Sequence, residues 1–168
     1  FLSFKNLYTI IFLSILILIL IMIFFIDLEN FIIPDSLNFS VMGLALVKNF
    51  IPSFNTSLIH DINQSLIGGI IGYLSIWLII FLYKTLKKID GMGLGDAKLM
   101  AGIGLLFGWQ SIPLVLFLSS ILGLFFVAPS LLKKQKTMKS EIPFGPFIII
   151  AMLIYFVFGD FFYGLILV

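Results

Sequence analysis

Residues 6–26 read NLYTIIFLSILILILIMIFFI, and no charged side chain interrupts this run before Asp27. An α-helix needs about 20 apolar residues to cross the hydrocarbon core of a bilayer, so the stretch predicts a membrane-spanning helix. The rest of the chain has the same character, with 61% hydrophobic residues, 11% charged residues and a mean hydropathy of +1.24. Soluble domains carry about 25% charged residues, so we expect lipid to cover part of this protein.

Charged residues and helix breakers divide the remainder of the chain into five further apolar segments. The predicted spans lie at about 36–51, within 62–83, and at about 97–108, 112–131 and 144–159. The fourth is short for a membrane, so it needs local bilayer thinning or burial among other helices. The predicted fold is an all-α, polytopic membrane bundle of about six helices, forming one membrane-embedded domain over residues 1–168. The apolar tail after Asp160 has no predicted place.

The distribution of lysines predicts the orientation of this bundle. One side of the predicted topology holds Lys84, Lys87, Lys88, Lys98, Lys133, Lys134, Lys136 and Lys139. The other side holds Lys5 and Lys48, and Lys48 is expected to snorkel towards the headgroups. Cytoplasmic loops carry the excess of lysine, so the first side is cytoplasmic. Most acidic residues fall on that same side: Asp27, Glu29, Asp35, Asp90, Asp96 and Glu141.

The composition also excludes several classes of function. The chain has no cysteine and a single histidine, His60, which excludes disulfides, thiol nucleophiles and the usual zinc sites. All its basic residues are lysines, and without arginine it lacks the side chain that clamps phosphate with two hydrogen bonds. We therefore expect no bound metal, no cofactor and no nucleic-acid partner.

Asp27 and Asp96 are the acidic residues best placed for chemistry. Asp27 directly follows the first apolar run, and Asp96 ends the sequence GMGLGD of residues 91–96. Acidic residues at membrane depth are costly and are candidates for function. Gly93 and Gly95 lack a Cβ and permit close approach, which leaves room for a peptide strand. Two adjacent aspartates share one proton, so one acts as a base towards water and the other as an acid towards a carbonyl.

Each of these carboxylates also has a structural explanation. Asp96 precedes a predicted helix, and capping that helix could be its only role. Asp27 could have no role beyond marking the membrane boundary. Asp35 is predicted to be a helix cap. Three glycines of the third span are predicted to be helix-packing positions: Gly68, Gly69 and Gly72.

Four ordered motifs resemble those of the type IV prepilin peptidases, bacterial members of the Gly-X-Gly-Asp membrane aspartyl proteases. The motifs are residues 27–35, which end in Pro-Asp, and residues 69–77, 91–100 and 141–146. With Gly108-Trp109-Gln110 they follow the family's order over nearly the whole chain.

The resemblance implies that Asp27 and Asp96 are the catalytic aspartates of an aspartic endopeptidase. It implies removal of the short, basic leader of type IV prepilins and pseudopilins at the cytoplasmic face of the bacterial cytoplasmic (inner) membrane. The partners are then those substrates and the lipid bilayer, and the products serve pili, protein secretion or DNA uptake. Five residues are assigned to substrate binding near the site: Gly93, Gly95, Pro143, Gly145 and Pro146.

Many members of that family carry an N-terminal cytosolic region with paired Cys-X-X-Cys motifs and also methylate the new N-terminus. This chain begins at Phe1, without cysteine, where that region ends in the relatives. We therefore expect either a truncated piece or a peptidase-only form, with the missing methionine favouring truncation, and N-methyltransferase activity is doubtful.

Two other functions remain open at this point. A presenilin-like or preflagellin-type protease shares the Gly-X-Gly-Asp logic but takes other substrates, and the motifs at 27–35 and 143–146 favour the prepilin type. A small proton- or cation-coupled transporter subunit would use the acidic residues to carry ions. It requires carboxylates near the middle of the membrane, whereas these lie at span ends.

Overall fold

The computed structural model describes residues 7–50, 62–87, 93–132 and 143–166, and all regular structure in this part of the chain is helical. The elements are α1 (Leu7–Asn30), α2 (Asp35–Val47), the short 3-10 helix η1 (Lys48–Phe50), α3 (Ile62–Lys87), α4 (Leu94–Phe107), α5 (Ser111–Leu132) and α6 (Gly145–Ile166). Each predicted span corresponds to one α-helix, which confirms the all-α bundle.

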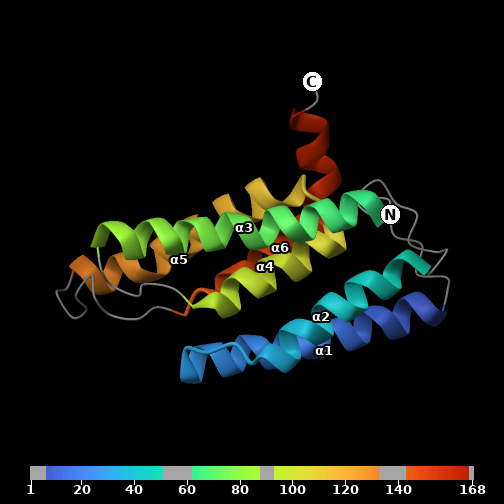
Figure 1. Cartoon of the computed structure of the whole chain (residues 1–168), viewed down its shortest axis with the longest axis horizontal. Helices are drawn as coiled ribbons and strands as arrows, with labels where there is room; N and C mark the ends of the chain where they lie inside the picture. Colours follow the sequence, from blue (N-terminus) through green and yellow to red (C-terminus); the bar gives the residue numbers. More distant parts are fainter. Residues whose placement is uncertain (1–6, 51–61, 88–92, 133–142, 167–168) are drawn as a thin grey trace.

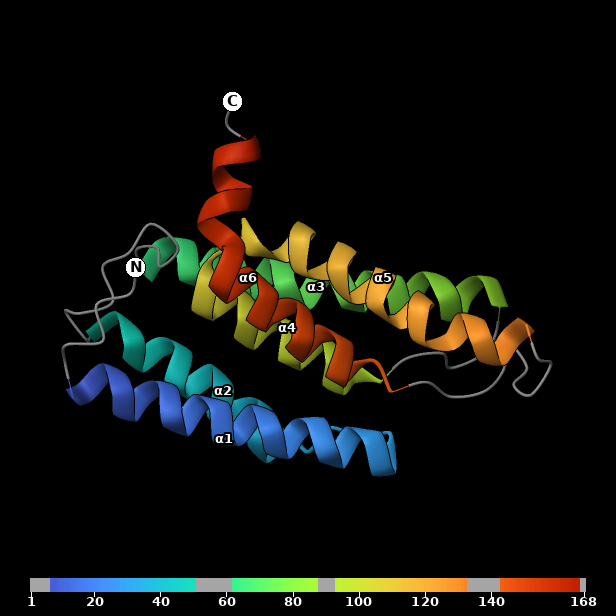
Figure 2. The ribbon, with the colours of Figure 1, turned by 180° about the vertical axis from the view of Figure 1, so that it is seen from behind.

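The helices are arranged around α4. Figures 1 and 2 show α1 and α2 as a pair on one side of α4, with α3 and α5 on the opposite side. Helix α4 packs mainly against α3 and α2, and α6 packs against α5 and α1. The last turns of α6 bend away from the other helices (Figure 1), so the apolar tail that the sequence could not place continues this helix to Ile166.

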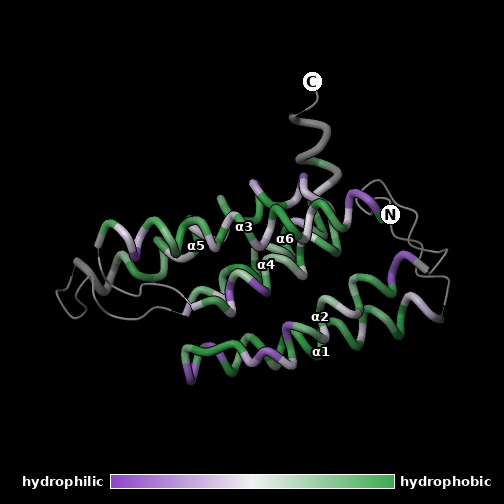
Figure 3. The backbone as a smooth tube through the Cα atoms, viewed as in Figure 1, coloured by the Kyte–Doolittle hydropathy of each residue, from purple (hydrophilic) through white to green (hydrophobic). Residues whose placement is uncertain are grey.

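The long helices consist mainly of apolar residues along their length, as Figure 3 shows. Three helices in the described part are long and apolar enough to cross a membrane: Leu7–Asn30, Ile62–Leu86 and Ser111–Ala128. Large apolar side chains such as Leu18, Leu78 and Phe125 are exposed on them, as expected of a surface covered by lipid. The chain is therefore a membrane protein. In contrast, most residues of α4 are buried, so the neighbouring helices cover this short helix.

Glycines bring α3 and α4 into main-chain contact. A Cβ on Gly104 would overlap the carbonyl oxygen of Gly68, and a Cβ on Gly72 would lie 2.5 Å from the carbonyl oxygen of Met100. A Cβ on Gly69 would lie 2.8 Å from the side chain of Leu105. The predicted helix-packing role of these three α3 glycines is therefore confirmed.

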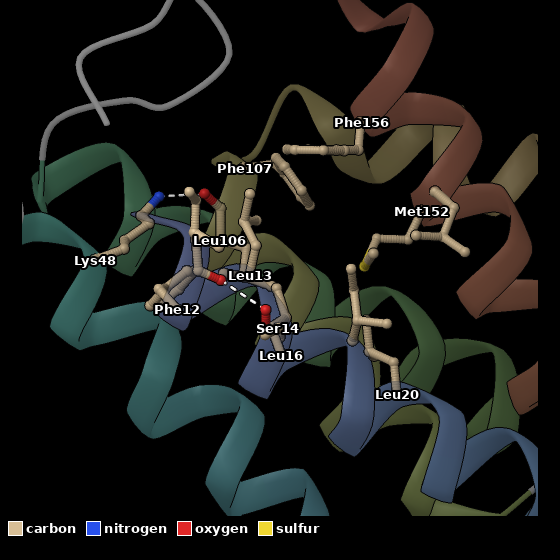
Figure 4. A pocket seen from close by; sticks show the side chains of 13 residues that line it. Phe12, Leu13, Ser14, Leu16, Leu20, Lys48, Leu106, Phe107, Met152 and Phe156 are labelled. Carbon is tan, nitrogen blue, oxygen red and sulfur yellow. Dashed lines mark hydrogen bonds between the residues drawn. The ribbon is translucent and has the colours of Figure 1, made fainter. Parts of the chain in front are cut away.

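Lys48 does not snorkel to the membrane surface. Its side chain is 1% exposed, and its ammonium group donates a hydrogen bond to the carbonyl oxygen of Leu106 in the last turn of α4 (Figure 4). The last carbonyls of a helix lack partners within the helix and carry partial negative charge. The snorkelling prediction is wrong because the end of α4 offers these acceptors inside the bundle.

Candidate active site

Asp27 lies in the last full turn of α1, which continues to Asn30, four residues beyond the end of the charge-free run at residue 26. Its side chain is 4% exposed, and its Oδ2 accepts a hydrogen bond from the backbone N–H of Gly145 at 3.0 Å. Gly145 is the first residue of α6, and the first N–H groups of a helix have no partner within it and favour an anion. The start of α6 therefore fixes the Asp27 carboxylate across 118 residues of sequence.

Asp96 is the third residue of α4 and is 7% exposed. The N-cap position of α4 is Gly93, and no side chain caps it by a hydrogen bond. The explanation of Asp96 as an N-cap is therefore wrong. Its buried Oδ1 has no hydrogen-bond partner among the residues that the structure describes, an arrangement that is costly to stability and needs another explanation.

The fold brings the segments that carry the two aspartates to one residue, Ile33. Both carboxyl groups are buried, and Gly145, which binds Asp27, and Gly95, which precedes Asp96, both lie against Ile33. The two aspartates come from different parts of the bundle. Asp27 is on α1, which pairs with α2 on one side, and Asp96 is on the central helix α4 (Figure 2).

Ile33 lies between the segments that carry the site. A Cβ on Gly95 would lie 3.0 Å from the Cβ of Ile33, and a Cβ on Gly145 would lie 3.0 Å from its Cδ1. The sequence analysis missed this residue, although it stands directly before the Pro-Asp pair of the first motif. The space beside Gly95 is thus filled by the chain itself, whereas Gly93 is exposed and only the Gly95 nitrogen, at 3.8 Å, lies within 4 Å of an added Cβ.

The motif at 143–146 reaches the site through Gly145. Pro143 and Pro146 flank this glycine and are both buried. Gly145 itself contacts the Asp27 carboxylate, which places the motif at the site. Three further residues of the motifs and loops lie outside the described residues: His60, Met92 and Glu141.

Polar residues of the first turns of α2 face α4. Asp35 is not a helix cap, because Pro34 occupies the N-cap position of α2 without a side-chain bond. Instead its carboxylate pairs with Lys98 at 2.6 Å on the surface. Asn38, one turn further on, donates from its Nδ2 to the carbonyl oxygen of Gly95 at 3.2 Å. The only sequence signal for Asn38 was an amide inside an apolar span, and it was missed.

A cavity of about 230 Å³ lies elsewhere, between α1, α4 and α6 beside Lys48 (Figure 4). Phe12, Phe107 and Met152 are among its lining side chains, and neither aspartate lines it. Within the described ranges, no group of three or more histidine, aspartate or glutamate side chains is arranged to hold a metal ion. The paired carboxylates are therefore the candidate site for chemistry in this part of the chain.

The sequence model of the type IV leader peptidase family matches residues 2–128, which include both aspartates. The chain belongs to the type IV leader peptidase family. The four motifs had predicted this family, and the match extends from before α1 into α5. Gly145 lies beyond the matched residues, so its contact with Asp27 comes from the structure alone.

Individual relatives support the same family. A prepilin leader peptidase/N-methyltransferase of Aeromonas hydrophila is 35% identical over 142 residues, covering 84% of this chain and 47% of the relative. The proteins of that name from Stutzerimonas stutzeri and Pseudomonas aeruginosa are 36% and 35% identical over 135 residues, covering 80% of this chain and 45% of each relative. The chain spans about half the length of the curated relatives it matches. No solved structure matches the chain.

Proposed function

We propose that this chain is a single membrane-embedded aspartic endopeptidase that removes the leader peptide of type IV prepilins or pseudopilins. The observation that carries the proposal is a pair of buried carboxylates, Asp27 and Asp96, whose neighbours Gly145 and Gly95 both lie against Ile33, in a member of the leader peptidase family. The relatives' names supply the substrate class, and the lysine distribution favours cleavage at the cytoplasmic face of the bacterial inner membrane. The proposal covers the leader peptidase activity that those names give and not the N-methyltransferase activity.

The surroundings of the two carboxylates suggest different roles in peptide hydrolysis. The N–H of Gly145 stabilises Asp27 as an anion, which suits a base that takes a proton from water. The Oδ1 of Asp96 is buried without a described partner, which suits a protonated carboxyl that donates to the scissile carbonyl oxygen. The water oxygen then bonds to the carbonyl carbon, the C–N bond breaks, and the leaving nitrogen takes up the proton that Asp27 received. The former carbonyl oxygen returns its proton to Asp96, which leaves a carboxylic acid and restores both aspartates.

The peptide has its most open approach beside Gly93. This residue is exposed and has space for a neighbour, whereas Ile33 closes the space at Gly95. We propose that substrate main chain lies along Gly93, with Gly95, Pro143, Gly145 and Pro146 forming the wall behind it. An ion-carrying subunit would need its carboxylates near mid-membrane, but Asp27 and Asp96 lie in terminal turns of their helices.

The test is co-expression of the chain with a prepilin and with a preflagellin, followed by mass spectrometry of the substrate N-termini. We expect the prepilin to lose its leader, with one new N-terminus, and the preflagellin to remain intact. Membranes without the chain serve as the control. If the chain is inserted and folded but the prepilin keeps its leader, the proposal is wrong; cleavage of the preflagellin alone would support the other protease class.

Gly145→Ala is expected to reduce kcat for leader removal while the protein still folds. The new Cβ would lie 2.7 Å from Oδ2 of Asp27, and because that atom ends a flexible side chain, the carboxylate can move aside. A misplacement of about 1 Å can reduce the rate about 100-fold. The measurement compares kcat and the melting temperature of the parent and the Gly145→Ala variant in detergent.

Gly123→Ala is the matched control, because its Cβ would meet Phe147 at an ordinary 3.5 Å. It should keep the parent's kcat. A Gly145→Ala enzyme with unchanged kcat would show that the Asp27–Gly145 contact does not matter for catalysis.

A further inference from the structure

Asn38 is a buried amide whose role is not explained by packing. Its side chain is 0% exposed, and its Nδ2 donates to the carbonyl oxygen of Gly95 at 3.2 Å, across 57 residues of sequence. Its Oδ1 is buried and has no hydrogen-bond partner among the described residues. Burying an acceptor without a partner is costly, so burial alone does not account for an asparagine at this position.

The bond reaches the backbone beside a proposed catalytic residue. The Gly95 carbonyl belongs to the peptide unit that connects Gly95 to Asp96, so Asn38 holds the main chain directly before the Asp96 Cα. This unit is in the first turn of α4, where helices fray and where the structure shows no side-chain cap. Gly95 has no side chain of its own to anchor that turn, so Asn38 supplies the anchor from α2.

The same bond connects the segments that carry the two aspartates. Helix α2 follows α1 after residues 31–34, so its first turns stand in a fixed relation to Asp27. A second link, between Asp35 and Lys98, lies on the surface, where an ion pair contributes little. The Lys48–Leu106 bond lies at the other end of α4, so the Asn38 bond is the partly buried link at the end that carries Asp96.

We propose that Asn38 is a positioning residue for Asp96: its amide holds the first turn of α4 so that the Asp96 carboxyl faces Asp27. This role rests on the proposed peptidase function. Asn38 itself touches neither the reacting atoms nor the peptide. Its loss should therefore lower kcat and leave KM nearly unchanged.

The first test reads the position of the α4 turn without any substrate. The chain has no cysteine, so Ala97→Cys places a single thiol beside Asp96, at a residue that is 0% exposed. Ala101→Cys, about one turn further along α4 and also buried (6% exposed), is the matched control, because its thiol also labels only when the structure opens. Each is combined with Asn38→Leu, which keeps a side chain of similar size and removes the donor, and is labelled with a water-soluble maleimide.

We expect Asn38→Leu to raise the labelling rate of the thiol at position 97 about tenfold, the factor that one lost buried hydrogen bond gives in a local opening equilibrium. The thiol at position 101 should label at the same rate in both backgrounds. An unchanged rate at position 97 overturns the proposal. An equal rise at both positions also overturns it, because the role is then general stability.

The second test measures leader removal by the purified protein. Asn38→Leu and Asn38→Asp should lower kcat about 10- to 100-fold with KM within about twofold, while the exposed Ser40→Ala on the same helix keeps the parent's values. Parent kcat in both Asn38 variants overturns the positioning role and leaves the peptidase proposal standing. If the parent itself does not cleave, the peptidase proposal fails, and the thiol labelling still decides whether Asn38 positions α4.

Discussion

Replacing Asp96 by asparagine is expected to lower the rate of leader removal by about 10²- to 10⁴-fold, the range that a positioned acid or base contributes. Asparagine keeps the size of the side chain but cannot exchange a proton. Asp96 is not the N-cap residue of α4, and the asparagine oxygen can still accept from a backbone N–H, so the helix should remain intact. Asp27→Asn should have a similar effect, because its amide oxygen can still accept from Gly145 but cannot take a proton from water.

The matched control for both variants is Glu29→Gln. Glu29 lies on α1 two residues after Asp27 and is exposed, so this change removes a carboxylate from the same helix without touching the site. Cleavage is followed by gel shift of the substrate, and folding by the melting temperature in detergent. A fully active Asp27→Asn or Asp96→Asn protein would disprove the two-aspartate mechanism, whereas loss of activity in Glu29→Gln would point to a general charge effect.

Gly104→Ala is expected to destabilise the bundle by about 3 kcal/mol or more, at or above the upper end of the usual effect of overpacking. The new Cβ would overlap the carbonyl oxygen of Gly68, and main-chain atoms cannot rotate away as a side chain can. Helices α3 and α4 would have to separate, which should lower the melting temperature and, because α4 carries Asp96, the rate of cleavage.

Gly43→Ala tests whether this effect comes from the contact or from the loss of a helical glycine. Nothing lies within 4 Å of a Cβ at Gly43, and alanine is a better helix former by about 1 kcal/mol. This variant should melt at or above the parent's temperature. Equal melting temperatures for the two alanine variants would show that the α3–α4 contact tolerates a side chain.

The six helices were predictable because an uncharged run of sufficient length must leave water, which is a local rule. Alternation of the spans predicted that Asp27 and Asp96 lie on one side of the membrane, and the lysine counts predicted which side that is. The α3 glycines were predictable for a similar reason, since small residues let membrane helices approach.

The errors concern side chains whose partner comes from a distant element. Lys48 was expected at the membrane surface because its own helix gives no sign of the unpaired carbonyl of Leu106, 58 residues away. Asp35 was expected to cap α2, but Lys98 competes for its carboxylate. The Gly145–Asp27 bond joins residues 118 apart, and only the packing of α6 on α1 brings them together.

The glycine contact between α3 and α4 also limits how the bundle can open. Main-chain atoms meet there at Gly68 and Gly104, so the two helices should move as one rigid body. Across α4, the contact with α2 runs through side chains, such as Val41 against Gly102, which can change rotamer. A second cavity between α1 and α6 shares residues with the one beside Lys48. The interfaces of α1 and α2 with the rest of the bundle are therefore the ones that can open. A peptide reaching Asp27 should displace this pair of helices rather than α3.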